Sequence, residues 1–409
     1  MKRNTTVRSA LGLLSPDEKR LILEIANEYS TTKDGIGRRI RWSASKINRV
    51  LHGLHGKQIL LVSRGEANGQ GRKPNVYRFN PGLGFFLGIH CDILADHLTI
   101  VDFAGTCIRN KSYPAKSYAD RALADFSETI DDFLEAVPAS VVESIRAAGI
   151  STATRFNEPG SVSFRSPSYT NTAMEPLRDT LAKRFRFPIY IGRPQVLICY
   201  GKYRSTLLAP KKSFINIIVT DNVGISIFIK GESYLGHSGL SGDLGHIKIP
   251  GNSLPCYCGS TGCLRTLISY MGICREVQNR IREVMNNGGS HALNLQDFTG
   301  PDYEKGVRLL IMRAVEHDPL ATDIVYSAAS HLGTVLATIV SLLNPEYLTI
   351  QTILAEAGPL FTERVRTIIR KNCLELYSMP LSIEFSSYEQ YSVSEGSAFF
   401  ARSNFLKET

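Results

Sequence analysis

The chain has 409 residues, 43% of them hydrophobic and 21% charged, which are ordinary values for a soluble globular protein of two or three domains. No apolar run in the sequence approaches the ~20 residues of a membrane-spanning helix, and the start, Met1-Lys-Arg-Asn-Thr-Thr6, lacks the apolar stretch of a secretory signal. With eight cysteines, three of them in one cluster, these features predict a cytoplasmic protein with no membrane partner and argue against a disulfide scaffold.

The excess positive charge lies in the first fifth of the chain. Residues 1–80 contain 16 Lys or Arg and 6 Asp or Glu, a net charge of +10, whereas the other 329 residues contain 31 and 32, a net charge of −1. Such an asymmetry is typical of a polyanion-binding module joined to a neutral body. The segment Asn80-Pro81-Gly82 is the expected linker, which gives predicted domains at residues 1–82 and 83–409.

Three helices and a hairpin are predicted in the N-terminal domain. Ser15 can cap the first helix, since Pro16 suits the first helical position and Glu18 completes a capping box. A short second helix is expected over residues 32–40, and Ser43 caps a third whose apolar residues recur at helical spacing. The β-branched and aromatic segments 59–62 and 75–79 predict the two strands.

The polar face of the third helix and the tip of the hairpin carry the candidate DNA contacts. On the helix these are side chains that can hydrogen-bond to base edges or phosphates: Ser43, Ser45, Lys46, Asn48 and Arg49. At the tip, Arg72 and Lys73 lie in a slim cationic segment that suits a minor groove. A basic face can also be only a solvated helix surface. Three short helices, a wing and the concentrated charge together favour a winged helix-turn-helix that binds double-stranded DNA.

From about residue 83 the pattern is that of an α/β body in two lobes. Strands are predicted at 85–90, 97–103, 147–151 and 187–191 in the first lobe, and at 213–220, 224–231 and 347–350 in the second. Helices are predicted at about 118–137 and 321–343. Strands that alternate with helices indicate α/β architecture.

The most specific motif is a run of candidate metal ligands. One imidazole and three thiols lie within 18 residues, as His246, Cys256, Cys258 and Cys263. This is a complete donor set for a closed, structural zinc site. Gly259 and Gly262 permit the tight loop between the last two cysteines. Reduced cysteines in a turn, or one disulfide, are the alternatives.

The same stretch resembles the ROK family (repressors, open reading frames, kinases). The family motif G-x-x-G-x-x-G-E-x-G-H, followed by C-x-C-G-x-x-G-C-L-E, is matched up to residue 265, with Asp243 and Arg265 in place of the two glutamates. Residues 42–49 and 71–74 are similar to the recognition helix and the wing of the family's repressors. The resemblance implies an actin-like, ribonuclease-H-like fold with a sugar cleft between two lobes.

The motifs of the family's kinases look lost. Arg193 and Pro194 stand where those enzymes carry an Asn-Asp pair, whose Asp is the general base. The two phosphate loops, at residues 90–94 and 220–226, lack glycines and present Asp92 and Asp221, which would repel phosphate. A Gly-Gly pair that seats the nucleotide is replaced by residues 351–352. The chain is therefore predicted not to be an enzyme; a sugar kinase with an added DNA-binding arm is the alternative.

The resemblance also implies an effector site, at the positions of Asp243, His246, Arg193 and Arg265. The two arginines favour an anionic effector such as a sugar phosphate or sugar acid, although a vestigial cleft that binds nothing is equally open. The sequence as a whole predicts a zinc-stabilised transcriptional regulator of carbohydrate-related genes, more a repressor than an activator. We expect a homodimer or homotetramer that reads a palindromic site. A scaffold that docks another protein is a third possibility.

Overall fold

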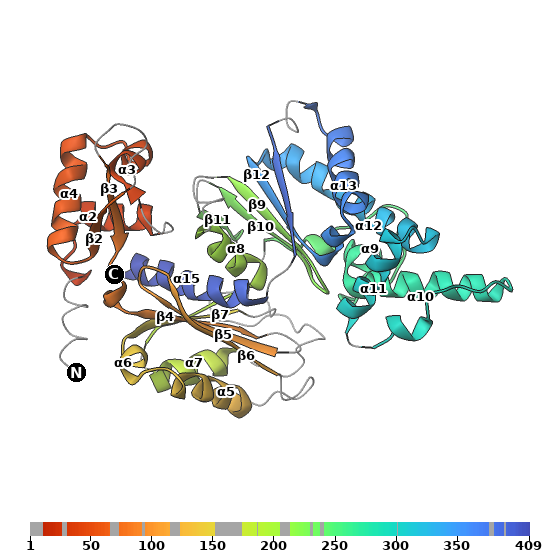
Figure 1. Cartoon of the computed structure of the whole chain (residues 1–409), viewed down its shortest axis with the longest axis horizontal. Helices are drawn as coiled ribbons and strands as arrows, with labels where there is room; N and C mark the ends of the chain where they lie inside the picture. The colour runs from red at the N-terminus through yellow and green to blue at the C-terminus, as the bar shows by residue number, and fades with distance from the viewer. Residues whose placement is uncertain are drawn as a thin grey trace. The chain divides into compact units, whose positions relative to one another are not determined.

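The computed structural model describes residues 11–26, 31–65, 73–91, 95–114, 123–151, 174–185, 187–204, 213–229, 232–237, 241–300, 302–375, 380–387 and 390–409. The chain divides into two compact units (Figure 1). The first contains Met1–Pro210 and Gln390–Thr409, and the second contains Lys211–Glu389. Each unit is built around a five-stranded sheet.

Three helices and a small sheet form the N-terminal module of the first unit, residues 11–79. The helices are α2 (Pro16–Ile25), α3 (Lys33–Arg39) and α4 (Ala44–Gly56). The antiparallel sheet has the order β1-β3-β2, with β1 (Thr31–Thr32), β2 (Leu60–Arg64) and β3 (Asn75–Phe79). The predicted capping box is present, because Ser15 Oγ accepts from the Glu18 N–H and the Glu18 carboxylate accepts from the Ser15 N–H. Ser43 caps α4 by accepting from the Lys46 N–H at 3.3 Å.

Glu18 also ties two helices of this module together. Its carboxylate is nearly buried and accepts a hydrogen bond at 2.7 Å from Lys57, which directly follows α4. Burial works to raise the pKa of Glu18, but hydrogen bonds from Lys57 and Ser15 outweigh it and lower that pKa. The charged pair therefore holds α2 against the end of α4. Beneath it lies an apolar core to which all three helices contribute: Leu21, Ile22, Ile25, Ile36, Ile47, Val50, Leu51 and Leu54.

The larger sheet of the first unit has the order β6-β5-β4-β7-β8. Its strands are β4 (Phe85–Cys91), β5 (Ala95–Asp102), β6 (Cys107–Pro114), β7 (Ile145–Ser151) and β8 (Ile189–Gly192). β4, β5 and β6 pair antiparallel, and β7 and β8 continue the sheet in parallel. Helices α5 (Leu123–Glu135) and α7 (Met174–Phe185) lie on one face of the sheet, and α15 (Gln390–Glu408) lies on the other (Figure 1). The short α6 (Ala139–Val142) precedes β7, and α8 (Pro194–Arg204) packs against α15.

Helix α15 approaches its neighbours closely because glycines remove side chains at three contacts. A Cβ atom on Gly88 of β4 would lie 1.9 Å from the carbonyl oxygen of Ser394, and one on Gly149 of β7 would lie 1.9 Å from that of Ser397. A Cβ atom on Gly396 of α15 would lie 1.9 Å from the carbonyl oxygen of Leu197 in α8. Backbone therefore contacts backbone at all three places, and no other residue type fits there.

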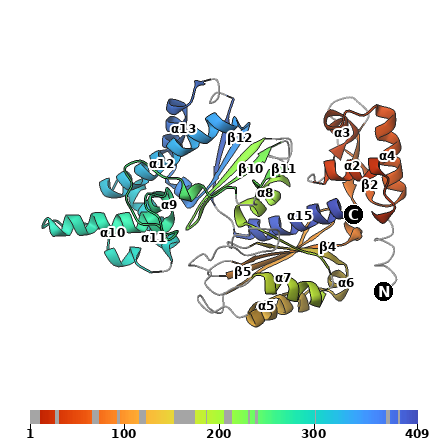
Figure 2. The same cartoon turned by 180° about the vertical axis from the view of Figure 1, so that it is seen from behind.

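The last turns of α15 contact the N-terminal module (Figure 2). Arg402, only 2% exposed, donates a hydrogen bond at 3.0 Å to the carbonyl of Phe103, just after β5. Its guanidinium lies 5.3 Å from the ring centroid of Phe79, at the end of β3, and the Phe79 and Phe103 rings pack edge to face at 5.6 Å. Lys19 of α2 also donates a hydrogen bond to the carbonyl of Thr409. These contacts join the module to the first unit.

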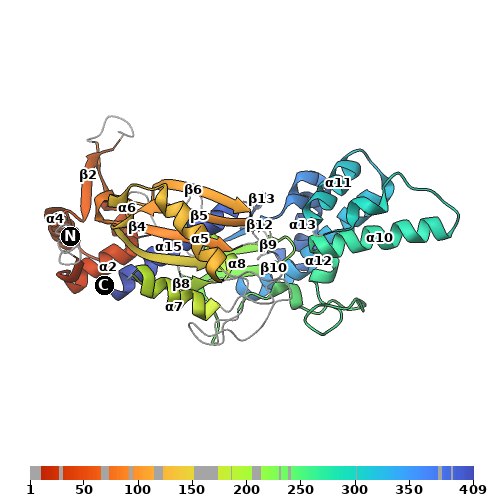
Figure 3. The ribbon, with the colours of Figure 1, turned by 90° about the horizontal axis from the view of Figure 1, so that it is seen from below.

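The sheet of the second unit has the order β11-β10-β9-β12-β13. Its strands are β9 (Phe214–Val219), β10 (Val223–Ile229), β11 (Glu232–Tyr234), β12 (Tyr347–Gln351) and β13 (Ser382–Ser386). β12 pairs in parallel with both β9 and β13, whereas β9, β10 and β11 are antiparallel. The helices are α9 (Arg265–Ile268), α10 (Tyr270–Asn286), α11 (Tyr303–Val315), α12 (Pro319–Leu343) and α13 (Pro359–Asn372), and α10 extends away from the rest of its unit (Figure 3). Short 3₁₀ helices are η1 (Pro81–Leu83), η3 (Leu244–His246), η4 (Leu295–Phe298) and η5 (Ile353–Ala357).

Helix α12 is the central helix of the second unit. Among the described residues it is the one helix long and apolar enough to cross a membrane by length and composition, and more than half of its most apolar part is buried inside the protein. Its buried residues belong to one core with α11, α13 and strands β9 and β12. The helix ends at Asn344, which takes the left-handed conformation with φ of 40°. The burial is that of a core helix, which is the simplest account of its composition.

The predicted helices and strands of both units are confirmed within the described residues. The strand predicted at 187–191 lies slightly later, at Ile189–Gly192, and the helix predicted at 118–137 is described as Leu123–Glu135. Helices α6 to α11, α13 and α15, and strands β1, β6, β11 and β13, were not predicted. The compact units divide near residues 210 and 390, so the N-terminal module shares a unit with the first lobe. The domain boundary at residue 82 stays a prediction.

We expect Gly396→Ala to destabilise the protein strongly, because the added methyl group would overlap the carbonyl of Leu197. Overpacking of this kind costs about 1–3 kcal/mol, and the backbone of two helices must move to relieve it. Gly56→Ala at the end of α4 is the matched control, since no heavy atom lies within 4 Å of its Cβ position. Urea unfolding of both variants measures the difference. Equal unfolding midpoints for the two variants would contradict the close contact.

Candidate functional site

The four candidate metal ligands converge in the second unit. The ligand atoms of His246, Cys256, Cys258 and Cys263 all lie within 4.8 Å of one another. The sulfurs of Cys258 and Cys263 are 3.8 Å apart, and the Cys256 sulfur is 3.7 Å from Nδ1 of His246. Two thiolates at ~2.3 Å from one tetrahedral ion would be about 3.8 Å apart, which is far from the ~2.05 Å of a disulfide. The cluster could therefore hold one metal ion.

Turns and two isolated β-bridges bring the cysteines together. Lys248 pairs with Cys263, and Pro255 pairs with Thr261, so the loop folds back on itself. The Cys256 N–H closes the tip by donating to the carbonyl of Ser260 at 2.8 Å. Gly259 and Gly262 have φ of 83° and 78°, where other residues are strained. The glycines predicted to permit the loop do so.

Residues around the cluster fix its ligands. The Asn252 amide donates to the carbonyl of Cys263 at 3.2 Å and to Thr266 Oγ1 at 2.9 Å. Nε2 of His246 lies 3.2 Å from the hydroxyl of Tyr257, so Nδ1 is the nitrogen that faces the cysteines. Such an outer partner sets the orientation of a ligating imidazole. Sequence reasoning missed both residues; Tyr257 was findable between two cysteines, whereas Asn252 has no local signal.

The surroundings shift the pKa values of Cys256 and Cys258 in opposite directions. Burial raises the pKa of Cys256 to about 11. Burial acts in the same direction on Cys258, but the Ser260 N–H, the neighbouring thiols and the charge of Lys248 outweigh it and lower the pKa of that thiol. The Lys248 ammonium also lies 3.4 Å from the Cys263 sulfur. A cation beside Cys258 and Cys263 favours the thiolate forms that a metal requires at these two positions.

Arg265 links the metal module, residues 241–266, to the turn between β9 and β10. It is 7% exposed, and its Nη2 donates to the carbonyl of Asp221 at 2.6 Å. Its guanidinium also stacks over the Tyr257 ring at 3.9 Å from the centroid. This single side chain therefore connects the turn between β9 and β10 with the tyrosine that contacts His246.

The other proposed effector residues divide between the units. Asp243 precedes the 3₁₀ turn that carries His246, and the His246 N–H donates to the Asp243 carbonyl at 3.2 Å. Asp243, His246 and Arg265 all belong to the metal module. Arg193 belongs to the first unit, directly after β8, and is 6% exposed. In the satisfied orientation of the Gln195 amide, the side-chain oxygen of Gln195 accepts from Arg193 Nε at 2.9 Å.

The positions that correspond to kinase motifs lie at strand ends. Arg193 lies between β8 and α8, Pro194 is the first residue of α8, and Asp221 lies in the turn between β9 and β10. Gln351 and Thr352, at the end of β12, are fully buried. Asp92 lies outside the described residues.

Most of the candidate DNA contacts are exposed side chains of the N-terminal module. Ser43, Ser45, Asn48, Arg49 and Lys73 are exposed. Lys46 is partly buried, because it forms an ion pair with Asp17 at 2.7 Å and lies 4.4 Å from the ring centroid of Trp42. Arg72 lies outside the described residues. Asn48 and Arg49 are therefore the outward polar side chains in the middle of α4.

A comparison with protein families matches residues 96–404 to the ROK family, and the chain belongs to that family. Among its relatives, the DNA-binding transcriptional repressor Mlc of Escherichia coli (strain K12) is 28% identical over 236 residues, which are 57% of this chain and 55% of Mlc. The chain thus spans about half the length of that relative. The xylose repressor of Bacillus subtilis (strain 168) is 21% identical over 355 residues, which are 86% of this chain and 85% of that repressor.

Solved structures agree on the fold. A ROK family transcriptional regulator, a homologue of Escherichia coli Mlc, superposes with a TM-score of 0.74 at 19% identity, and the match covers 98% of this chain and 97% of that one. A ROK family glucokinase from Streptomyces griseus, solved with glucose and AMPPNP, gives 0.60 at 21% identity, over 78% of this chain and 99% of that one. The predicted actin-like α/β body is confirmed by these likenesses.

Two glycines allow a matched test of the metal module. A methyl group on Gly262 would lie 2.7 Å from the carbonyl of Asn252, whereas one on Gly259 would meet nothing within 4 Å. Both residues have positive φ, so each alanine costs about 1 kcal/mol for the backbone. We expect Gly262→Ala to cost at least about 1 kcal/mol more, measured by thermal unfolding of both variants. Identical melting temperatures would refute the close packing of Asn252 on the loop.

Proposed function

We propose that this protein is a sequence-specific DNA-binding transcriptional regulator of carbohydrate-related genes, and that it acts as a repressor. The main support is the N-terminal module, residues 11–79, which precedes the region that matches the family. In this module helix α4 presents exposed polar side chains. The glucokinase covers 78% of this chain, while the transcriptional regulator covers 98%. The named repressors among the relatives support the same assignment.

The proposed interface with double-stranded DNA is a winged helix-turn-helix. Helix α4 enters the major groove, where Asn48 and Arg49 reach base edges and Ser43 and Ser45 contact phosphates. Lys46 is held by Asp17 and Trp42, so we assign it to positioning α4 on the backbone. Arg72 and Lys73 hold the adjacent minor groove. The net charge of +10 in residues 1–80 supplies the attraction that does not depend on sequence.

The proposed cofactor is a structural Zn²⁺ ion held by His246, Cys256, Cys258 and Cys263. One imidazole and three thiolates leave no open position for a substrate, so the ion would stabilise the loop. Zinc also suits this donor set better than hard cations do, because thiolates are soft ligands. A metal bound by these four residues would supply energy that fixes the loop.

The proposed effector is a sugar or sugar phosphate that contacts Asp243, His246, Arg193 and Arg265. Asp243 would accept hydrogen bonds from hydroxyl groups, and the arginines would favour an anionic group. One N–H group of Arg265 donates to the carbonyl of Asp221, and other N–H groups of its guanidinium remain for a ligand. An anion would have to approach these groups beside the ring of Tyr257. Calorimetry with neutral and phosphorylated hexoses tests the preference. Tighter binding of the neutral sugar would overturn the anionic assignment.

We further propose a homodimer or homotetramer in the cytoplasm. One winged helix contacts only a short stretch of DNA, and two copies related by symmetry would read a palindromic site. The second candidate function is sugar phosphorylation, which the likeness to a glucokinase favours. Pro194, with no titratable group, argues against it. ATP-dependent phosphorylation of hexoses at a rate above background would favour the kinase.

We expect Asn48→Ala and Arg49→Ala each to weaken binding to the specific operator by roughly 10- to 100-fold, since a good base contact discriminates by about 1–3 kcal/mol. The operator is first obtained by enriching fragmented genomic DNA of the source organism on the purified protein. Binding to unrelated DNA should change far less. Arg282→Ala on α10, an exposed arginine in the second unit, is the charge-matched control. If both variants bind the operator as tightly as the parent protein, α4 is not the element that recognises the DNA sequence.

We expect the purified protein to contain one zinc ion per chain and Cys263→Ser to lose it. Because the ion would fix the loop, a chelator should lower the melting temperature of the parent protein and leave that of the variant unchanged. Cys107→Ser is the control, as Cys107 is an exposed cysteine of the first unit. Metal content is measured by atomic emission. Equal zinc content in Cys263→Ser and the parent would refute the site.

A further inference from the structure

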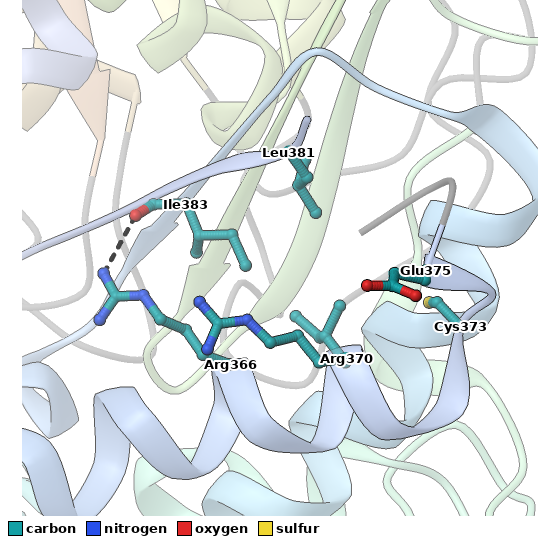
Figure 4. A pocket seen from close by; sticks show the side chains of 7 residues that line it. Arg366, Arg370, Cys373, Glu375, Leu381 and Ile383 are labelled. Carbon is teal, nitrogen blue, oxygen red and sulfur yellow. Dashed lines mark hydrogen bonds between the residues drawn. The ribbon is translucent and has the colours of Figure 1, made fainter. Parts of the chain in front are cut away.

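A cavity in the second unit lies apart from the metal module. It has a volume of about 520 Å³ and is lined by residues of α13, of β13 and of the chain beside them (Figure 4): Arg366, Ile369, Arg370, Cys373, Glu375, Leu381 and Ile383. This volume is within the range of about 300–1,000 Å³ that small-molecule sites occupy. None of these residues belongs to the family motifs or to the proposed zinc, DNA or effector sites.

The floor of the cavity is apolar and fixed. Ile369 is 1% exposed and belongs to the main core of the unit. Leu381 and Ile383 are half-buried and pack against the same core from the strand side. Cys373 is held in place, since its thiol donates to the carbonyl of Ala337 at 3.2 Å. An apolar group placed here would therefore meet a preformed surface and gain by leaving water.

Arg366 forms a rigid cationic wall. Its Nη1 bonds Glu363 at 2.7 Å and its Nη2 donates to the carbonyl of Ile383 at 3.1 Å. The guanidinium lies 4.8 Å from the ring centroid of Phe385. These contacts fix the plane of the group and use two of its five N–H donors, so donors remain for a ligand. A guanidinium held in this way is prepared to meet a carboxylate or phosphate.

Arg370 lies one helical turn further along α13 and extends in the same direction as Arg366 (Figure 4). Within the described residues it makes no hydrogen bond or ion pair. Two guanidinium groups four residues apart repel each other unless an anion lies between or beside them. The dipole of α13 favours basic residues in its last turn, which accounts for Arg370 but not for Arg366 or for the cavity beside them.

The charge of the surroundings is uneven. Helix α13 carries Glu363 against four basic residues, and Arg364 is turned to the α12 side, where it stacks over Tyr326 at 3.9 Å. Glu375 lies at the opposite end of the cavity from the guanidinium of Arg366 (Figure 4). A carboxylate at that end would repel an anion, so a ligand would place its charged group at the arginine end and its apolar body towards the floor.

From these observations we infer that the cavity between α13 and β13 binds a small organic anion, with a carboxylate or phosphate group held by Arg366 and Arg370 and an apolar body over Ile369, Leu381 and Ile383. The site is separate from the proposed sugar effector site, so it would give the protein a second small-molecule input. Recognition depends on both parts of the ligand, since neither inorganic phosphate nor a neutral apolar molecule satisfies both surfaces.

The test uses three fluorinated probes of similar size: 4-fluorobenzoate, 4-fluorophenyl phosphate and the neutral 4-fluorobenzyl alcohol. Binding to the full-length protein is measured by ¹⁹F NMR. We expect at least one of the anions to bind saturably and the alcohol to bind at least roughly tenfold more weakly, because charged hydrogen bonds are worth about 1.5–3 kcal/mol. The stronger of the two anions identifies the charged group.

Arg370→Gln should weaken binding of that anion by roughly tenfold, and Arg370→Glu should abolish it. Within the described residues Arg370 makes no hydrogen bond or ion pair, so neither change should disturb folding. Arg282→Gln, on an exposed face of α10, controls for the change in net charge. Equal binding of the alcohol, no binding of either anion, or anion binding that survives Arg370→Glu would each overturn the inference.

Discussion

Direct contact between the backbone of α15 and its neighbours is the constraint on which the first unit depends. Because Gly88 and Gly149 have no side chains, α15 contacts the backbone of β4 and β7 directly. Gly396 likewise lets α8 contact the backbone of α15. Backbone-to-backbone contacts fix the position of α15 more strictly than side-chain packing does. A side chain can change its rotamer, whereas a backbone carbonyl cannot move without its helix. The sheet, α8 and α15 therefore form one rigid assembly.

This assembly also determines where the N-terminal module lies within its unit. The buried Arg402 joins α15 to Phe103 at the end of β5 and to Phe79 at the end of β3, and Lys19 reaches the last residue. α15 begins where the chain leaves the second unit, at Gln390. The module is thus attached through a helix that has little freedom to adjust, and a hydrogen-bonded arginine is a more specific attachment than apolar contact alone.

The parts of the fold that could be predicted from sequence are those with local causes. Ser15, Pro16 and Glu18 determine the start of α2 by themselves, and the spacing of four ligands identifies the metal cluster wherever the rest of the chain lies. The return of α15 to the first unit has no such local cause, since it depends on glycines some 250 or 300 residues away in sequence. Asn252 was also missed, because an amide that donates a hydrogen bond to a cysteine carbonyl belongs to no sequence motif. The loss of kinase motifs stays a prediction, and the contacts that Arg265 makes with Asp221 and Tyr257 could not be predicted from the sequence.

Arg265 is the side chain that joins the turn between β9 and β10 to the metal module. A glutamate at this position is only an acceptor when ionised, so it cannot bond the carbonyl of Asp221. A guanidinium can, and it also stacks on Tyr257, whose hydroxyl meets His246. With Arg265 in place, the turn at Asp221 is tied to the metal module. Because the acceptor is a backbone carbonyl, this bond constrains the turn whichever side chains the turn carries. Arg265→Glu alone would remove the donor from that carbonyl, at a cost of about 1–3 kcal/mol.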